Sequence, residues 1–392
     1  MSKAPSDIDQ HFMRQALRLA ERGRGTTRPN PVVGAVVVKA GKVLARGFHE
    51  QAGQPHAEIV ALSKLGMHAP GATLYVTLEP CCHQGRTGPC TEAIQRAGID
   101  RVVVGCCDEN PLVSGRGVAL LRGAGLDVAA GCLKDECYRQ NRTFFTWVRK
   151  QRPWVTLKVA TTLDGFIGDR HERERKGQAR WITGAAARTR AHQLRAEHDA
   201  VLIGVGTVLA DDPLLTVRTA DKKPRRPLRI VLDSHLRTPT DSALVAPSRD
   251  HAPPLIVAAE TSRSDRGLAV RRRKLERLGT EVLVLRADRQ GHVSLPALLH
   301  ELADREVQSL LVEGGSRIHG AFIHRRLVDS VALFLAPRLV GRGVPVVESA
   351  GLDWKHPAKL GPFQVEALGP DVLITADVID PGKARHASSK IR

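Results

Sequence analysis

One stretch of the sequence concentrates residue types that bind metals and move protons. It contains the triplet His56-Ala57-Glu58 and the segment 79–90, which reads EPCCHQGRTGPC. Imidazole and thiolate are ligands that zinc prefers, and a zinc site with three protein ligands keeps its fourth position for water. We therefore expect His56, Cys81 and Cys90 to bind zinc and Glu58 to act as the general acid and base. The chemistry predicted from these residues is the activation of water.

Other interpretations of the same residues remain open. Cys82 and His83 are rival ligands, although adjacent residues seldom both point inward, and we interpret His83 as a polar loop contact. The cysteines could also be buried thiols beside an unrelated histidine. A structural zinc site would need a fourth protein ligand, whereas the free Glu58 favours an open position.

The elements that must position these residues can be predicted from the pattern around them. Helices are expected over 56–65 and 90–97, so that His56 and Cys90 each stand at a helix start, where the positive end of the helix dipole favours thiolate and hydroxide. A β-branched strand over 73–78 delivers the cysteine loop. The other elements expected in this half are a helix over 9–22, strands over 32–38, 43–47, 102–105 and 126–130, a short helix within 112–125, and a helical connector over 137–150. Alternating strands and helices indicate an α/β layered sheet.

A second domain is expected after Arg152-Pro153. We predict domains over 1–150 and 151–380, with a polar, disordered tail over 381–392. The segment 171–180 is expected to be an exposed loop. Strands are expected over 154–160, 200–204, 228–232, 254–258, 282–285, 309–312, 331–335 and 372–378, and helices over 183–197 and 317–325.

Composition limits the classes of function. The 392 residues contain no apolar run that approaches the roughly 20 residues of a membrane span, and the N-terminus lacks the apolar core of a secretory signal. All seven cysteines lie in the first 140 residues, a pattern that suits metal ligands and buried thiols in a reducing compartment, so we expect a cytoplasmic protein with no membrane partner. The net charge of +18 raises nucleic acid as a partner, but aromatic residues are only 4% and offer few stacking platforms. We favour a solvated basic surface, either from a host with arginine-rich proteins or suited to attracting phosphorylated substrates, and expect no nucleic acid partner.

The motifs resemble those of a known enzyme family. The generic zinc-deaminase pattern of H-x-E with P-C-x-x-C is met only in part, because the interval from Cys81 to Cys90 is longer. The longer form, LEPCCHQGRTGPC, resembles the bifunctional riboflavin-biosynthesis family that joins diaminohydroxyphosphoribosylaminopyrimidine deaminase to 5-amino-6-(5-phosphoribosylamino)uracil reductase. The resemblance covers nearly the whole chain, through blocks such as RPNPVVGAVVV, CCDENPLVSGRG, LKVATTLDG, GVGTVLADDPLLTVR, LVEGGSRIHGAF and LAPRLVG.

The resemblance implies the fold, the cofactors and the reactions. It implies a cytidine-deaminase-like three-layer domain followed by a dihydrofolate-reductase-like domain, with Zn²⁺ and NADPH as cofactors. The first domain would deaminate 2,5-diamino-6-(5-phosphoribosylamino)pyrimidin-4(3H)-one, a small phosphorylated pyrimidine, and the second would reduce its ribosyl chain to ribityl. We also expect a homo-oligomer.

Site residues carried over by matching blocks are also what the resemblance implies. Those near the deaminase substrate are Asn30, His49, Arg86, Asp108 and Asn110. Those near the reductase cofactor are Ala160, Trp181, Thr207, Asp211, Ser234, Gly315, Ser316, Arg317, Ile318, His319, Gly320 and Ala321, and those near its substrate are Ala179, Arg195, Leu215, Arg218 and Glu313. On their own, several have simpler interpretations: Asp108 and Asn110 as turn residues, Arg195 as a surface-helix arginine, Arg218 as a strand-end arginine and Trp181 as a core tryptophan.

Three departures from the family pattern concern the reductase half. Ala179 stands where the family usually has serine, Phe166 replaces a basic residue after Leu-Asp-Gly, and the loop 171–180 is longer than usual. A deaminase with a weakened reductase half is therefore one alternative, and a basic deaminase of nucleic-acid bases is another.

Overall fold

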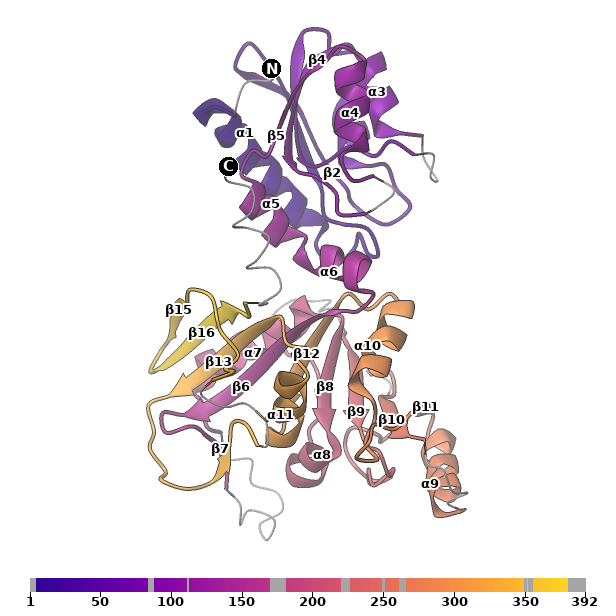
Figure 1. The fold of residues 1–392 in the computed structure, drawn as a ribbon, viewed down its shortest axis with the longest axis vertical. Helices are drawn as coiled ribbons and strands as arrows, with labels where there is room; N and C mark the ends of the chain where they lie inside the picture. Colours follow the sequence, from indigo (N-terminus) through magenta and orange to yellow (C-terminus); the bar gives the residue numbers. More distant parts are fainter. Residues whose placement is uncertain are drawn as a thin grey trace. The chain divides into compact units, whose positions relative to one another are not determined.

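The computed structural model describes residues 5–83, 88–110, 113–169, 181–219, 226–248, 251–260, 266–348, 351 and 355–379. The chain divides into two compact units, Met1–Arg152 and Pro153–Arg392, each built on its own sheet (Figure 1). Arg86, Ala179, the loop 171–180 and the tail 381–392 lie outside the described residues. In the described part of the chain, no helix combines the length and the apolar character that crossing a membrane requires.

The first unit is a five-stranded sheet in the order β2-β1-β3-β4-β5, covered by helices on both faces. The strands are β1 (Gly34–Lys39), β2 (Lys42–Phe48), β3 (Ala72–Leu78), β4 (Ile99–Cys106) and β5 (Asp127–Ala130). β1 pairs antiparallel with β2 and β3, whereas β3, β4 and β5 are parallel. The helices are α1 (Asp7–Ala20), η1 (Glu21–Gly23), α2 (Ala57–Ser63), α3 (Cys90–Arg96), α4 (Arg116–Gly123), α5 (Lys134–Gln140) and α6 (Arg142–Lys150).

Two hydrophobic cores hold these three layers together. Ala61 and Leu62 of α2, Ile94 of α3 and Leu121 of α4 pack on one face of the sheet. The other face is covered by α1, α5 and α6 through a cluster that includes Phe12, Met13, Ala16, Cys137 and Phe145. The near-continuous runs of buried residues in β1, β3 and β4 suit a sheet that is buried on both sides.

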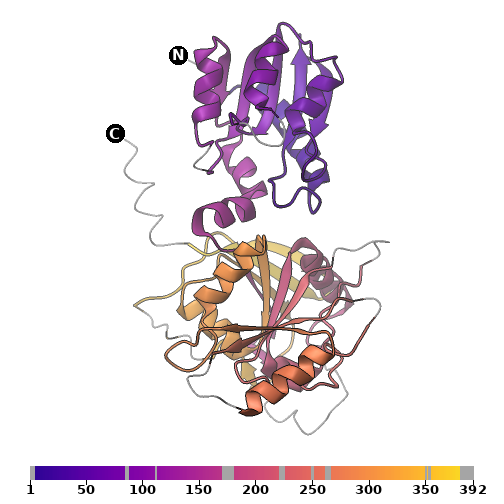
Figure 2. The ribbon, with the colours of Figure 1, turned by 90° about the vertical axis from the view of Figure 1, so that its right-hand side faces the viewer.

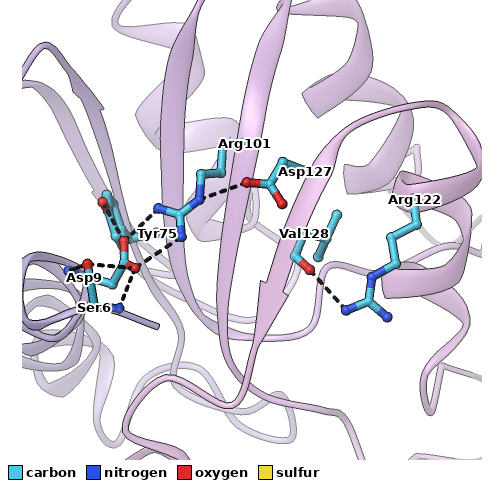
Figure 3. Close-up of polar contacts among 7 residues, drawn as sticks. All are labelled: Ser6, Asp9, Tyr75, Arg101, Arg122, Asp127 and Val128. Atoms are coloured by element: carbon cyan, nitrogen blue, oxygen red, sulfur yellow. Dashed lines mark hydrogen bonds and ion pairs between the residues drawn. The ribbon is translucent and has the colours of Figure 1, made fainter. Parts of the chain in front are cut away.

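A buried ionic network fixes α1 to the sheet (Figure 3). Ser6 caps α1, and the Asp9 carboxylate accepts hydrogen bonds from Ser6, from the Tyr75 hydroxyl and from both terminal nitrogens of Arg101. Arg101 also donates from Nε to Asp127 at 3.1 Å. The Arg101 guanidinium thereby joins the start of α1 to β4 and β5, and the Asp9 carboxylate adds β3 through Tyr75.

The second unit is a nine-stranded sheet in the order β11-β10-β9-β8-β12-β6-β13-β16-β15. Its strands are β6 (Trp154–Thr162), β8 (Ala200–Gly204), β9 (Leu228–Leu232), β10 (Leu255–Ala259), β11 (Glu281–Leu285), β12 (Ser309–Gly314), β13 (Ser330–Ala336), β15 (Gln364–Leu368) and β16 (Asp371–Asp377). The strands from β11 to β13 are parallel, and β16 and β15 add antiparallel pairs. The short strands β7 (Phe166–Gly168) and β14 (Val344–Pro345) pair separately. The helices are α7 (Ala185–Glu197), α8 (Val205–Asp211), α9 (Arg266–Arg277), α10 (Leu295–Asp304) and α11 (Ser316–His324), and Figure 2 shows this unit from the side of α9 and α10.

The mixed α/β class expected from the sequence is confirmed, but several elements differ from the predictions. The helices α8, α9 and α10 were not predicted, nor were β7, β14 and β15, and the helical connector is two helices that meet at Asn141. α10 had a readable signal, since Ser294 precedes it, Pro296 lies in its first turn and its leucines recur at helical spacing. The helical pattern of α9 is weak, because five of its twelve residues are arginines and, of the described side chains, only Leu268 and Leu275 pack against the core.

Candidate active sites

Three predicted ligands meet in the first unit. His56 is the N-cap of α2, Cys90 is the first residue of α3, and Cys81 follows β3. The His56 Nδ1 atom lies 3.3 Å from the Cys90 sulfur and 3.5 Å from the Cys81 sulfur. All three donor atoms lie within 4.8 Å of one another, and no other such group occurs among the described residues. One nitrogen and two sulfur donors at this spacing fit a zinc ion.

The surroundings support deprotonation of one thiol. Hydrogen bonds from the Cys90 thiol, from His56 and from the Cys90 backbone lower the pKa of Cys81, although burial opposes this. Cys82 is partly exposed and His83 is exposed, and neither joins the cluster of donor atoms.

Glu58 lies beside the three donors without being one of them. It stands in the first turn of α2, and its side chain is buried. Burial raises the pKa of Glu58. A buried carboxyl group next to a metal centre can take up and return a proton.

Asn30 and His49 form a second polar pair. The Asn30 amide lies 3.1 Å from His49 Nε2, and His49 Nδ1 lies 3.1 Å from the carbonyl oxygen of Pro55. The His49 ring meets the His56 ring edge-on with centroids 5.4 Å apart. Burial lowers the pKa of His49, which favours the neutral form of the ring.

Asp108 and Asn110 lie in the loop after β4. Asp108 Oδ1 accepts the backbone N–H of Asn110 at 2.8 Å, the turn geometry that short acidic side chains adopt. Burial raises the pKa of Asp108 to about 6, against the opposing effect of that hydrogen bond. The backbone N–H of Asp108 donates to the carboxylate of Glu79, a residue for which the sequence analysis predicted no role. The one sequence feature that draws attention to Glu79 is its position between a β-branched strand and the cysteine segment.

In the second unit, two glycine turns stand side by side at the carboxyl ends of the parallel strands β8 and β12. A Cβ at Gly204 would come within 2.8 Å of Ile318 Cγ1, and one at Gly315 would lie 3.5 Å from Thr207 Oγ1. Ser316 and His319, in the first turns of α11, each carry a buried polar atom that has no hydrogen-bond partner among the described residues. The glycines leave backbone N–H groups accessible at the start of α11, and the Ser316 and His319 side chains offer further polar atoms. Such a site is suited to a cofactor that carries phosphate groups.

A buried ionic cluster lies further along the same edge. Glu313 of β12 pairs with Arg195 of α7 through two hydrogen bonds of 2.5 and 2.8 Å, and the Lys158 ammonium lies 3.7 Å from Glu313. Burial would raise the pKa of Glu313, but the two cations lower it to about 2. Lys158 was not among the predicted site residues. A lysine inside the largely apolar strand WVTLKVA is the sequence feature that could have pointed to it.

The loop after α8, which carries Leu215 and Arg218, contacts Arg195 of this cluster through Thr216. Arg195 donates to the Thr216 carbonyl oxygen at 3.0 Å, and Arg218 donates to Thr216 Oγ1 at 3.3 Å. Leu215 has a φ of +53°, a left-handed conformation that costs a branched side chain energy. Arg195 is therefore a largely buried residue paired with Glu313, and its interpretation as a surface-helix arginine is wrong.

The other predicted reductase residues are more scattered. Trp181 is 59% exposed and stacks under the Arg188 guanidinium, so it is not a core tryptophan. Ser234 Oγ accepts the backbone N–H of Val293. Asp211 ends α8 at the surface, and Arg317 pairs with Glu348 at 3.6 Å with its side chain 86% exposed. Ala160 lies on β6, and Ile318, Gly320 and Ala321 lie on α11.

Two family models match the chain. Residues 6–106 match the cytidine and deoxycytidylate deaminase zinc-binding region, and residues 153–374 match the RibD C-terminal domain.

Curated relatives match over nearly the full length. The riboflavin biosynthesis protein RibD of Aquifex aeolicus is 42% identical over 94% of this chain and 98% of its own. That of Escherichia coli is 38% identical over 93% of this chain and 98% of its own. Among solved structures, Acinetobacter baumannii RibD is 35% identical with a TM-score of 0.79, over 95% of this chain and 99% of its own. A diaminohydroxyphosphoribosylaminopyrimidine deaminase/5-amino-6-(5-phosphoribosylamino)uracil reductase from Thermotoga maritima is 36% identical with a TM-score of 0.76 over the same shares.

Proposed function

The chain belongs to the RibD family of riboflavin-biosynthesis proteins, and from this premise we propose how its residues divide a deaminase and a reductase activity. We assign zinc-dependent deamination to the domain 1–150 and NADPH-dependent reduction to the domain 151–380. The substrates proposed for them are the phosphoribosylaminopyrimidines that the name of the Thermotoga relative specifies.

The observation that carries the deaminase assignment is the cluster of His56, Cys81 and Cys90 with Glu58 buried beside it. These three residues would hold zinc, which when bound acts as a Lewis acid that makes water a stronger nucleophile at neutral pH. Glu58 takes a proton from the attacking water and gives it to the amino nitrogen of the substrate. The carbon–nitrogen bond then breaks, ammonia leaves, and the remaining water proton passes to the adjacent ring nitrogen as a carbonyl replaces the amino group.

Substrate contacts in this domain are proposed for the residues around that cluster. The Asn30–His49 pair presents an amide that can read a pyrimidine edge, held in place by the contact of His49 with the Pro55 carbonyl. Asp108 and Asn110 would approach from the loop after β4. Arg86, which suits a phosphate, lies outside the described residues.

The reductase assignment is supported by the paired glycine turns and by the ionic cluster. The start of α11, with Ser316 and His319, would hold phosphate and ribose groups of NADPH, which supplies a hydride to the ribosyl carbon. Glu313, with Arg195 and Lys158 on its two sides, would face the phosphorylated substrate, and arginine is suited to clamping a phosphate.

The test assays ammonia release and NADPH oxidation separately on the purified protein. Glu58→Gln should keep one zinc per chain and lose ammonia release by at least about a hundredfold, the usual contribution of a general acid–base group. Reduction of pre-deaminated substrate should continue at the rate of the unmodified protein. Glu136→Gln, which alters an exposed glutamate of α5, is the matched control. If Glu58→Gln abolished both activities together, the assignment of two separate sites would be wrong.

The same assays decide the alternatives, which the family assignment does not favour. A protein that deaminates but does not oxidise NADPH would have a weakened reductase half, and deamination of an RNA or DNA base would point to a nucleic-acid deaminase. We further propose a cytoplasmic location, because all seven cysteines are free thiols. A homo-oligomer also remains a prediction, which light scattering would test.

A further inference from the structure

The Glu79 carboxylate, buried at the end of β3, accepts hydrogen bonds only from backbone groups within the described part of the chain. Its Oε2 accepts the N–H of Asp108 at 3.2 Å and that of Gly115 at 2.8 Å. Its Oε1 accepts the N–H of Val118 at 3.1 Å. The side chain is only 4% exposed. The two oxygens of one side chain therefore hold three backbone N–H groups from two successive segments, an arrangement we call the clamp.

The clamp joins two parts of the deaminase site. On one side, Glu79 is separated from the proposed zinc ligand Cys81 by Pro80 alone. On the other side, the three donors span the loop after β4 and the first turn of α4, where a negative charge also complements the helix dipole. This loop carries Asp108, a proposed substrate contact.

A second close contact ties the same two parts together. A Cβ added to Gly117 would lie 2.1 Å from the Pro80 carbonyl oxygen and 3.2 Å from Glu79 Cγ. The first turn of α4 therefore rests directly on the backbone that leads to Cys81.

We propose that Glu79 is the positioning residue that sets the substrate-facing loop, with Asp108 and Asn110, at a fixed place relative to the zinc ligand Cys81. The inference rests on the proposed deaminase function and adds a residue to it. Glu79 acts through the loop and takes no part in proton transfer.

Glu79→Gln tests this proposal because an amide keeps one oxygen and replaces the other by a donor. If the amide oxygen takes the place of Oε2, the NH₂ group faces the N–H of Val118, and two donors oppose each other. If the amide is flipped, the NH₂ group faces the N–H groups of Asp108 and Gly115 instead. We expect KM for the pyrimidine to rise about tenfold while kcat falls less than about twofold, because the substrate contacts move and the reacting groups stay. Zinc content and NADPH oxidation should be unchanged. Glu92→Gln, on the exposed side of α3, is the matched control.

Two further measurements separate positioning from general support of the fold. In a double-mutant cycle, Glu79→Gln combined with Asp108→Asn should raise KM no more than the stronger single change, since both act through one loop. Gly117→Ala disturbs the same junction and should also raise KM. An unchanged KM, a loss of zinc, or multiplicative effects in the cycle would overturn the proposal. If the unmodified protein released no ammonia from the pyrimidine, the proposed function itself would fail, whatever the variants do.

Discussion

The Asp9 network of Figure 3 gives a prediction whose size can be worked from the structure. Burial by itself would raise the pKa of Asp9, but the hydrogen bonds from Arg101, Ser6 and Tyr75 outweigh it and lower the pKa from 3.8 to about 2. At 1.36 kcal/mol per pKa unit, and allowing for solvent screening at the partly exposed Arg101, the carboxylate stabilises the first unit by about 2 kcal/mol. Asp9→Asn should therefore lower the midpoint of heat inactivation of ammonia release by about 4–8 °C.

The pH dependence of this contribution has a definite sign. Because the pKa of Asp9 is lower in the folded protein than in the unfolded chain, the stabilisation is fully present above about pH 4 and is lost as the pH falls toward about 2. The difference in midpoint between the unmodified protein and Asp9→Asn should narrow over that range.

The control for Asp9→Asn is Asp127→Asn, which removes the other carboxylate that contacts Arg101. Asp127 makes one hydrogen bond to Arg101 and its side chain is 49% exposed, so its loss should cost less than about 1 kcal/mol. Heat inactivation of NADPH oxidation should not change in either variant if the units unfold independently. Equal shifts for Asp9→Asn and Asp127→Asn, or no shift for Asp9→Asn, would refute the reasoning.

Three other predictions follow from the described contacts. The buried Arg229 donates to the carbonyl oxygens of Leu214 and Ala252, so Arg229→Lys should free the loop at Leu214 and raise KM of the reductase about tenfold without changing ammonia release. Gly47→Ala would place a Cβ 2.3 Å from the carbonyl oxygen of Ala57 at the start of α2, so ammonia release and zinc content should both fall. Gly88→Ala, whose Cβ would meet no described atom within 4 Å, should leave both unchanged. Removal of zinc by a chelator should abolish ammonia release and leave NADPH oxidation intact, measured on the same sample.

The sequence by itself determined the chemistry of the deaminase site. One histidine, two cysteines and a nearby glutamate at helix starts limit the metal and the reaction, because zinc accepts few ligand types and proton transfer needs a free carboxyl group. The long Cys81–Cys90 interval and the ordered blocks indicated the family, and the alternation of strands and helices gave the α/β class. These features are local, so a pattern of residue types can carry them.

Tertiary structure decided which distant residues meet. Sheet order places β12 between β8 and β6, and this order brings Lys158, Arg195 and Glu313 into one buried cluster although they are far apart in the sequence. The same is true of Glu79, whose partners lie up to 39 positions along the chain. Every non-proline residue carries a backbone N–H, so the residue types at 108, 115 and 118 do not identify these positions as the partners of Glu79.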